Sequence, residues 1–150
     1  MKPVARVVAV TLLLAAAPAQ AADFCAALQT VVAAAGGPSP FQSITGGAIN
    51  NDPGRLATSA PLPGFAQCEI QPKRGTSDYS CYTLNLGPAQ MKALEASVLA
   101  DLEKCLGDKL ARESETPISR WTARAAPGSY PLLALDSAAG QVAFTFTTLR

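Results

Sequence analysis

The chain has 150 residues, of which 49% are hydrophobic and 15% are charged, and its formal net charge is +1. This length supports one domain with a buried core. The near-neutral charge provides no electrostatic footprint for nucleic acid or anionic lipid, so we expect no nucleic-acid partner. The sequence contains no histidine, which removes the commonest general base and metal ligand and excludes Ser-His-Asp and Cys-His catalytic sites.

The N-terminal segment has the three parts of a secretory signal peptide. Lys2 and Arg6 form a short positive region, residues 7–17 are almost wholly apolar, and Ala19 and Ala21 place small residues at positions −3 and −1 of a signal-peptidase site. A membrane anchor needs about 20 apolar residues, and this apolar run is near half that length. We therefore expect cleavage after Ala21 and localisation to the periplasm or the cell exterior.

Removal of residues 1–21 leaves a single domain of 129 residues, 22–150. Its basic residues fall from 12 to 10 against 11 acidic residues, so the net charge remains close to zero at −1. Residues 22–150 contain no apolar run long enough to span a bilayer. We expect no stable membrane insertion once the leader is removed.

All four cysteines lie in this domain, at Cys25, Cys68, Cys81 and Cys105. An even number of cysteines in an exported chain indicates a disulfide framework, for which three connectivities exist. Zinc sites usually bring cysteines in closely spaced C-x₂₋₄-C pairs, and none of these four is so close to another. The sequence therefore predicts two disulfides and no metal or other cofactor.

The residues between Cys68 and Cys81 fit a β-hairpin that turns at Arg74 and Gly75. Counting outward from this turn makes Cys68 and Cys81 a non-hydrogen-bonded pair, in which the two Cα atoms come closest. A cross-strand disulfide is reachable there, near the short limit of Cα separations. Arg-Gly is a weaker hairpin turn than Asn-Gly, so a longer loop over residues 73–78 is the alternative.

Two helices are expected, at residues 23–35 and 88–106. Apolar residues recur at helical spacing in both segments, and the second segment has a proline at its first position and a glycine just past its end. Cys25 begins the first helix and Cys105 ends the second. Antiparallel packing of the helices would bring these two cysteines together, so we predict the pairs Cys25–Cys105 and Cys68–Cys81.

Short segments bounded by Gly, Pro, Asn and Ser predict β-strands. These segments are residues 41–48, 56–60, 66–71, 79–86, 118–124, 130–135 and 142–149. We expect residues 50–63 to be mostly loop and residues 107–115 to be a charged linker. Strands that follow one another at hairpin distance imply an α+β fold, in which an antiparallel sheet built from hairpins is covered by two helices and stapled by two disulfides.

Three segments carry recognisable patterns. Residues 41–46 read F-x-x-I-x-G, residues 62–70 read L-P-G-x-x-x-C-x-I, and residues 105–108 read C-L-G-D. In these patterns the chain resembles small uncharacterised exported bacterial α+β proteins with four cysteines, a resemblance that covers most of residues 22–150 and implies no particular activity. In element order alone the chain is also similar to type III secretion chaperone-like folds.

The side chains with chemical potential have ordinary structural interpretations. The acidic pairs lie two residues apart, so their members do not share a helix face, and we expect a solvated surface. These pairs are Asp101 with Glu103 and Glu113 with Glu115. Trp121 is expected in the core, with a binding-site aromatic as the alternative. Lys73 and Arg74 are expected to solvate the hairpin tip, with contact to an acidic group as the alternative. Tyr79 and Tyr82 alternate across their strand, so one of them is available to face a partner.

These observations favour a binding function over catalysis. G-x-S-x-G, the P-loop pattern and G-x-G-x-x-G are all absent. We hypothesise an exported, non-catalytic binding or interaction module whose ligand the sequence does not identify, with an unknown protein partner as one candidate. The alternatives are a carboxylate-dependent hydrolase and a structural accessory subunit of an envelope complex.

Overall fold

A computed structural model describes residues 17–36, 38–107, 110–114, 119–123 and 132–149. The chain runs helix, four strands, helix, four strands. The elements are α1 (Ala17–Ala35), the 3₁₀ turn η1 (Gln42–Ile44), β1 (Thr45–Ile49), β2 (Asp52–Thr58), β3 (Gln67–Lys73), β4 (Thr76–Thr83), α2 (Pro88–Leu106), β5 (Leu110–Ser114), β6 (Ser119–Ala123), β7 (Leu132–Ala138) and β8 (Gln141–Leu149).

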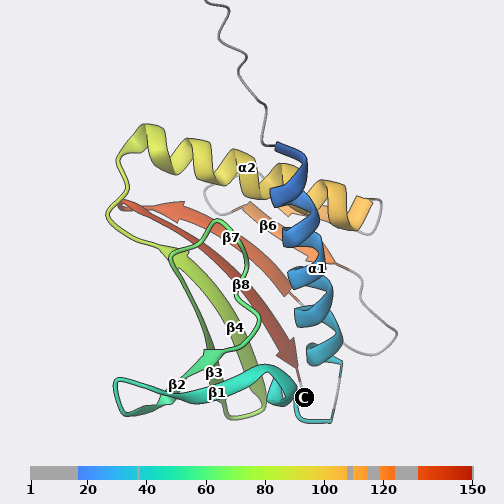
Figure 1. Ribbon diagram of the computed structural model, residues 1–150, viewed down its shortest axis with the longest axis vertical. Helices are drawn as coiled ribbons and strands as arrows, with labels where there is room; N and C mark the ends of the chain where they lie inside the picture. Colours follow the sequence, from blue (N-terminus) through green and yellow to red (C-terminus); the bar gives the residue numbers. More distant parts are fainter. Residues whose placement is uncertain (1–16, 37, 108–109, 115–118, 124–131, 150) are drawn as a thin grey trace, which may run out of the picture.

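Within the described residues, the eight strands form one antiparallel sheet in the order β1-β2-β3-β4-β8-β7-β6-β5. Figure 1 shows that the sheet is curved, and that α1 and α2 lie on the same face of it. The other face has no helix against it among the described residues, and we call it the open face. The α+β fold class predicted from the sequence is confirmed.

Most element boundaries follow from local chemistry. Helix α2 occupies the predicted residues, beginning with Pro88 at its first turn and ending at Gly107, where φ is 54°. The side chain of Gln90 accepts a hydrogen bond of 2.9 Å from the Gly87 N–H, which satisfies a backbone donor at the helix start. Helix α1 begins at Ala17, earlier than predicted, so the expected cleavage after Ala21 falls inside its backbone, and residues 1–16 lie outside the described part of the chain.

Two expectations about irregular segments were wrong. Residues 52–58 were expected to be mostly loop, with a strand only near 56–60, and they form β2; residues 110–114 were expected to lie in a linker, and they form β5. In both segments the local composition argues against a strand, with Pro53 and Gly54 in β2 and charged residues in β5. Pairing with an adjacent strand satisfies the backbone groups and overrides this weak preference.

The core lies between the helices and the sheet. Helix α1 contributes Phe24, Leu28 and Val31 at helical spacing, all at most 1% exposed. Strand β8 alternates as predicted, and its inward side chains, Val142, Phe144, Phe146 and Thr148, are buried. Strands β3 and β4 add Ile70, Tyr79 and Cys81 to the same layer. This alternation leaves the intervening residues of each strand on the open face.

Both predicted disulfides are present. Cys25 of α1 is bonded to Cys105 of α2 with a Cα separation of 5.2 Å. Cys68 and Cys81 are directly paired across β3 and β4 with a Cα separation of 4.0 Å. The two-residue turn at Arg74 and Gly75 sets this register, so the longer-loop alternative is wrong.

The fold repeats itself once, although the sequence shows no repeat. Each half is a helix followed by a four-stranded antiparallel meander, and the halves join through β4 and β8. A shift of 65 residues relates the β3–β4 hairpin to the β7–β8 hairpin, because it converts the pair Cys68–Cys81 into Leu133–Phe146. Ser80 and Thr145 are related by the same shift and pair with each other. An approximate twofold axis therefore passes between them.

Candidate functional site

A buried carboxylate lies on the open face of the first half. Alternation along β3 places Glu69 between Cys68 and Ile70, opposite the core. Glu69 is nevertheless only 1% exposed. Neighbouring polar side chains, rather than a helix, cover it. A charged group removed from water in this way requires hydrogen-bonding partners, and the surrounding strands supply them.

Arg55 of β2 and Tyr82 of β4 hold this carboxylate from either side. Arg55 donates from Nε to both oxygens of Glu69, at 3.2 and 3.1 Å, and from Nη2 to Oε2 at 2.6 Å. Tyr82 donates its hydroxyl proton to Oε2 at 3.1 Å and accepts a bond of 2.7 Å from Arg55 Nη2. One buried residue thus orders side chains from two other strands.

Two glutamines on β3 complete the polar cluster. Gln71 donates from Nε2 to Oε1 of Glu69 at 2.6 Å, and Gln67 donates from Nε2 to Oε2 at 3.4 Å. A carboxylate accepts hydrogen bonds and donates none, so it fixes which end of each amide faces it. The carbonyl ends of Gln67 and Gln71 therefore point away from Glu69. We call Arg55, Gln67, Glu69, Gln71 and Tyr82 the polar cluster.

The ionisation of the cluster follows from these bonds. Burial is the largest single influence on Glu69 and favours its neutral form, but the hydrogen bonds from Arg55, Gln71 and Tyr82 together hold the pKa of Glu69 below its ordinary value. The hydrogen bond to Glu69, followed by its charge, raises the pKa of Arg55. Burial and the bond to Glu69 raise the pKa of Tyr82. At neutral pH the cluster is an ionised Arg–Glu pair with a neutral phenol.

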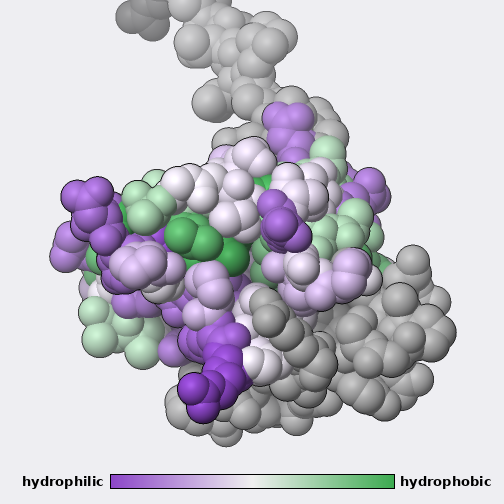
Figure 2. Space-filling view, turned by 90° about the horizontal axis from the view of Figure 1, so that it is seen from below, coloured by the Kyte–Doolittle hydropathy of each residue, from purple (hydrophilic) through white to green (hydrophobic). Residues whose placement is uncertain are grey.

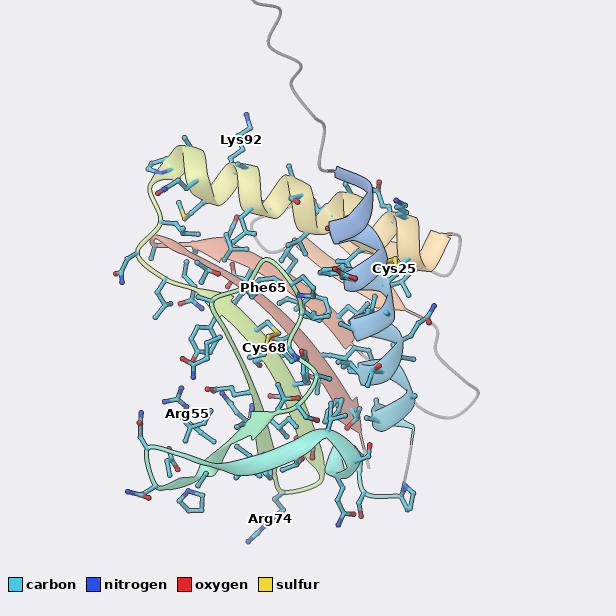
Figure 3. The ribbon with its side chains drawn as sticks, in the orientation of Figure 1. Cys25, Arg55, Phe65, Cys68, Arg74 and Lys92 are labelled. Atoms are coloured by element: carbon cyan, nitrogen blue, oxygen red, sulfur yellow. A yellow bond between two sulfur atoms is a disulfide. The ribbon has the colours of Figure 1, made fainter. Side chains whose placement is uncertain are left out.

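A second ion pair lies beside the cluster. Lys73, at the end of β3, forms a salt bridge with Asp78 of β4, whose carboxylate is mostly buried. Arg74 follows at the hairpin tip and is exposed. Figure 3 shows Arg55 on the sheet and Arg74 at the bottom of the hairpin, while Lys92 lies on α2 at the opposite end of the molecule.

The second half of the molecule serves as an internal control for this cluster. On the core side, the 65-residue shift relates the pair Ile70–Tyr79 to the pair Leu135–Phe144, and all four of these side chains are large and buried. On the open face the same shift takes Glu69 to an alanine, Ala134. The same fold is therefore built without a buried carboxylate at this position.

Other open-face positions differ in the same way. Tyr82 corresponds to Thr147, Gln71 to Asp136 and Asp78 to Ala143. The described side chains of the second half are thus mostly short at the positions where the first half carries long polar ones. The polar cluster is a property of the first half and is not required by the fold.

This arrangement suits recognition better than acid–base chemistry. Both oxygens of Glu69 accept several hydrogen bonds, and its pKa is lowered, which makes it a poor proton acceptor for a substrate. The described residues contain no group of three or more Cys, Asp or Glu side chains that could hold a metal ion. What the cluster offers is a set of fixed donors and acceptors.

The remaining sequence-predicted residues lie elsewhere. Tyr79 is in the core, where its hydroxyl donates a hydrogen bond of 2.6 Å to the carbonyl oxygen of Ala60. Burial raises the pKa of Tyr79. Tyr82 is the tyrosine that faces outward. The backbone of Trp121 pairs with Leu133, and its side chain lies outside the described part. Of the predicted acidic pairs, Asp101 and Glu103 lie on α2, whereas the side chains of 113 and 115 are not described.

Sequence reasoning missed Arg55 and Glu69 for identifiable reasons. Arg55 lies in a segment expected to be mostly loop, and the strand predicted at residues 66–71 carried no expectation about Glu69. One signal was available, because a glutamate between Cys68 and Ile70 places a charge at the middle of a central strand. Charges there need a partner on an adjacent strand.

No protein-family model, curated protein or solved structure matches this chain. Among the described residues, no helix has the length and apolar character needed to cross a membrane. Any functional conclusion therefore depends on the chemistry of the molecule itself.

Proposed function

We propose that this protein is an exported binding module that holds a protein partner on the open face of β2, β3 and β4. The observation that carries the proposal is the difference between the two halves. The first half carries the polar cluster, whereas the second half has Ala134 at the position of Glu69. The second half therefore shows that the fold can be built without the cluster. Residues that the fold does not need are candidates for recognition.

The cluster has the properties of a pre-organised binding surface. Arginine and tyrosine are over-represented among the residues that dominate protein–protein binding energy. Arg55 and Tyr82 are fixed by Glu69 before any partner arrives, so little side-chain freedom remains to be lost on association. The buried glutamate acts here as a positioning residue.

The disulfides and the leader support the proposed location. Disulfides form and persist mainly in oxidising compartments, and this small domain carries two. The N-terminal pattern of charge, apolar run and small residues is typical of a secretory leader. We place the binding module in the periplasm or outside the cell.

Site-specific photocross-linking in the producing cell tests the binding face. A benzophenone amino acid is placed at Thr76 or, as a matched control, at Gln141, which is the same position in the second half. Both residues are half-exposed, and neither belongs to the cluster. We expect a cross-linked partner from Thr76 that is absent from Gln141 and is lost when Tyr82→Ala is added.

Two results would count against this proposal. Cross-linking of equal strength from both positions would show that the cluster does not define the binding face. A cross-link from Thr76 that is unchanged by Tyr82→Ala would show that the cluster does not contribute to binding.

A further inference from the structure

In the two ion pairs at the polar cluster, the acidic side chain is buried and the basic side chain is accessible to solvent. Glu69 and Asp78, the acidic members of the two ion pairs, are 1% and 8% exposed. Their basic partners are much more accessible, with side-chain exposures of 37% for Arg55 and 52% for Lys73. The acids therefore lie beneath the bases, and solvent meets the positive ends of both pairs.

Arg74 extends this positive surface at the hairpin tip. It is exposed, and no ion pair involving it occurs among the described residues. Its neighbour Gly75 is exposed, and among the described residues no atom lies within 4 Å of the position that a Cβ would take there. Figure 2 views the molecule from below, the end at which Arg74 lies, and strongly hydrophilic residues gather there at the left edge and the lower centre, with a hydrophobic area between them. We call Arg55, Lys73 and Arg74 the cationic corner.

Acidic residues near the corner do not cancel it. Asp52 begins β2, but alternation places it with Leu56 on the side of β2 away from Arg55, and its Oδ1 accepts a hydrogen bond from the Gly54 N–H. Asp136 is on the open face of β7, three strands from β3. At the usual spacing of neighbouring strands, β7 and β3 are about 14 Å apart. The domain is near neutral as a whole, yet the charged side chains that these two ion pairs and Arg74 present to solvent are basic.

The geometry of Arg55 leaves a donor edge free for a partner. Its Nε and Nη2 groups bind Glu69 and Tyr82, while no acceptor for Nη1 occurs among the described residues. A guanidinium carries five N–H donors, so two remain on Nη1. A carboxylate that approached from solvent would complete a Glu69–Arg55–carboxylate arrangement.

We propose that the partner docks on the cationic corner through an acidic segment of its chain. This inference rests on the proposed binding function and names the chemistry of the partner. Charge complementarity argues for it, because the corner presents two exposed cations and the partly exposed Arg55, and their own counter-ions are buried or, among the described residues, absent. The buried carboxylates of Glu69 and Asp78 partly neutralise Arg55 and Lys73. The role of the corner is therefore to fix the position and register of the acidic segment.

Titration with acidic and neutral peptides tests the proposal. The purified protein, labelled with ¹⁵N and with both disulfides formed, is titrated with a decaglutamate peptide and separately with a neutral Gly-Ser peptide of equal length. We expect amide shifts in β2, β3 and the Arg74 turn with decaglutamate only. The affinity should fall as salt is raised above about 0.1 M, where the Debye length is near 10 Å.

Matched charge reversals locate the binding. Arg74→Glu and Lys92→Glu change the net charge equally, but Lys92 lies on α2, far from the corner (Figure 3). We expect Arg74→Glu to weaken decaglutamate binding by roughly fivefold or more, the effect of at least one exposed ion pair. Lys92→Glu should change it by less than about twofold. The double variant Arg55→Gln/Glu69→Gln keeps the net charge and should also weaken binding.

Several outcomes would overturn the proposal. Equal effects of Arg74→Glu and Lys92→Glu would show that binding responds to net charge alone. Equal binding of decaglutamate and the Gly-Ser peptide would show that the corner does not select an acidic segment. Stronger binding to vesicles of anionic phosphatidylglycerol than to decaglutamate would assign the corner to a lipid surface. If cross-linking from Thr76 persists but does not depend on Arg74, the binding face stands and the acidic partner is wrong.

Discussion

The substitution Glu69→Gln tests the energetics of the polar cluster. It keeps the shape of the side chain but replaces one acceptor oxygen with an NH₂ group. At the Oε1 position this group faces the donors of Arg55 and Gln71, and at the Oε2 position it faces those of Arg55 and Tyr82. Hydrogen bonds to a charged group are each worth about 1.5–3 kcal/mol. Since Arg55 is 37% exposed and can recover water, we expect a net loss near the lower end, about 2 kcal/mol. For a domain of this size that is a decrease in melting temperature of about 6 °C.

The effect of this substitution should depend on pH in a defined direction. The pKa of Glu69 is lower in the folded protein than its ordinary value. A depressed carboxyl pKa contributes stability above the unfolded-state pKa, and that stability is lost as the pH falls through the folded-state pKa. The difference in unfolding free energy between wild type and Glu69→Gln should therefore be greatest near neutral pH and shrink below about pH 4.

Urea denaturation followed by far-UV circular dichroism measures this difference at each pH. The matched control is Asp136→Asn, which removes one carboxylate from the open face of the second half. We expect the control to change the unfolding free energy by no more than about 0.5 kcal/mol. A Glu69→Gln difference that is equally small, or one that stays constant from neutral to acid pH, would refute the assignment of Glu69 as an ionised, hydrogen-bonded centre.

Three further predictions concern the scaffold. The disulfides close loops with sequence separations of 80 and 13 residues, for which chain entropy gives about 4.5 and about 3 kcal/mol, so Cys105→Ser should lower the melting temperature more than Cys81→Ser; the reverse order would contradict the loop-entropy argument. Gly140 and Gly75 have φ of 80° and 79°, but a Cβ added at Gly140 would lie 3.3 Å from the Leu86 carbonyl oxygen, whereas one added at Gly75 would meet nothing within 4 Å. Thermal melts should therefore show Gly140→Ala to be the more destabilising change, by about 1 kcal/mol or more, and equal losses would contradict the steric argument. N-terminal sequencing of exported protein should begin at Ala22, and a start at Met1 in the membrane fraction would contradict the leader.

The scaffold could be predicted from the sequence because its signals are local. The turn at Arg74 and Gly75 sets the register of the hairpin, and this register alone brings Cys68 and Cys81 together. Helix α2 has a proline at its start and a glycine at its end, so its limits could be predicted to the residue. Alternation along β8 likewise predicted the correct inward face.

The polar cluster and the repeat could not be predicted because they depend on contacts between distant segments. Glu69 is buried by Arg55, which is 14 residues away on a strand whose composition resembles a loop. The repeat is hidden because the two halves share apolar positions but differ on the open face, where Glu69 corresponds to Ala134. Pattern reasoning on one chain detects periodicity and turns, and it does not detect such pairs.

One measurement tests the central claim that the polar cluster serves binding and is not needed for folding. The triple variant Arg55→Ala/Glu69→Ala/Tyr82→Thr removes the buried charge together with Arg55 and Tyr82, and it replaces Glu69 and Tyr82 with the residues of their second-half counterparts. Removing a whole ion pair is far less costly than breaking it. We predict that the variant is exported, forms both disulfides and unfolds cooperatively, but no longer cross-links its partner from Thr76. A variant that fails to fold, or one that folds and still cross-links, would contradict the account.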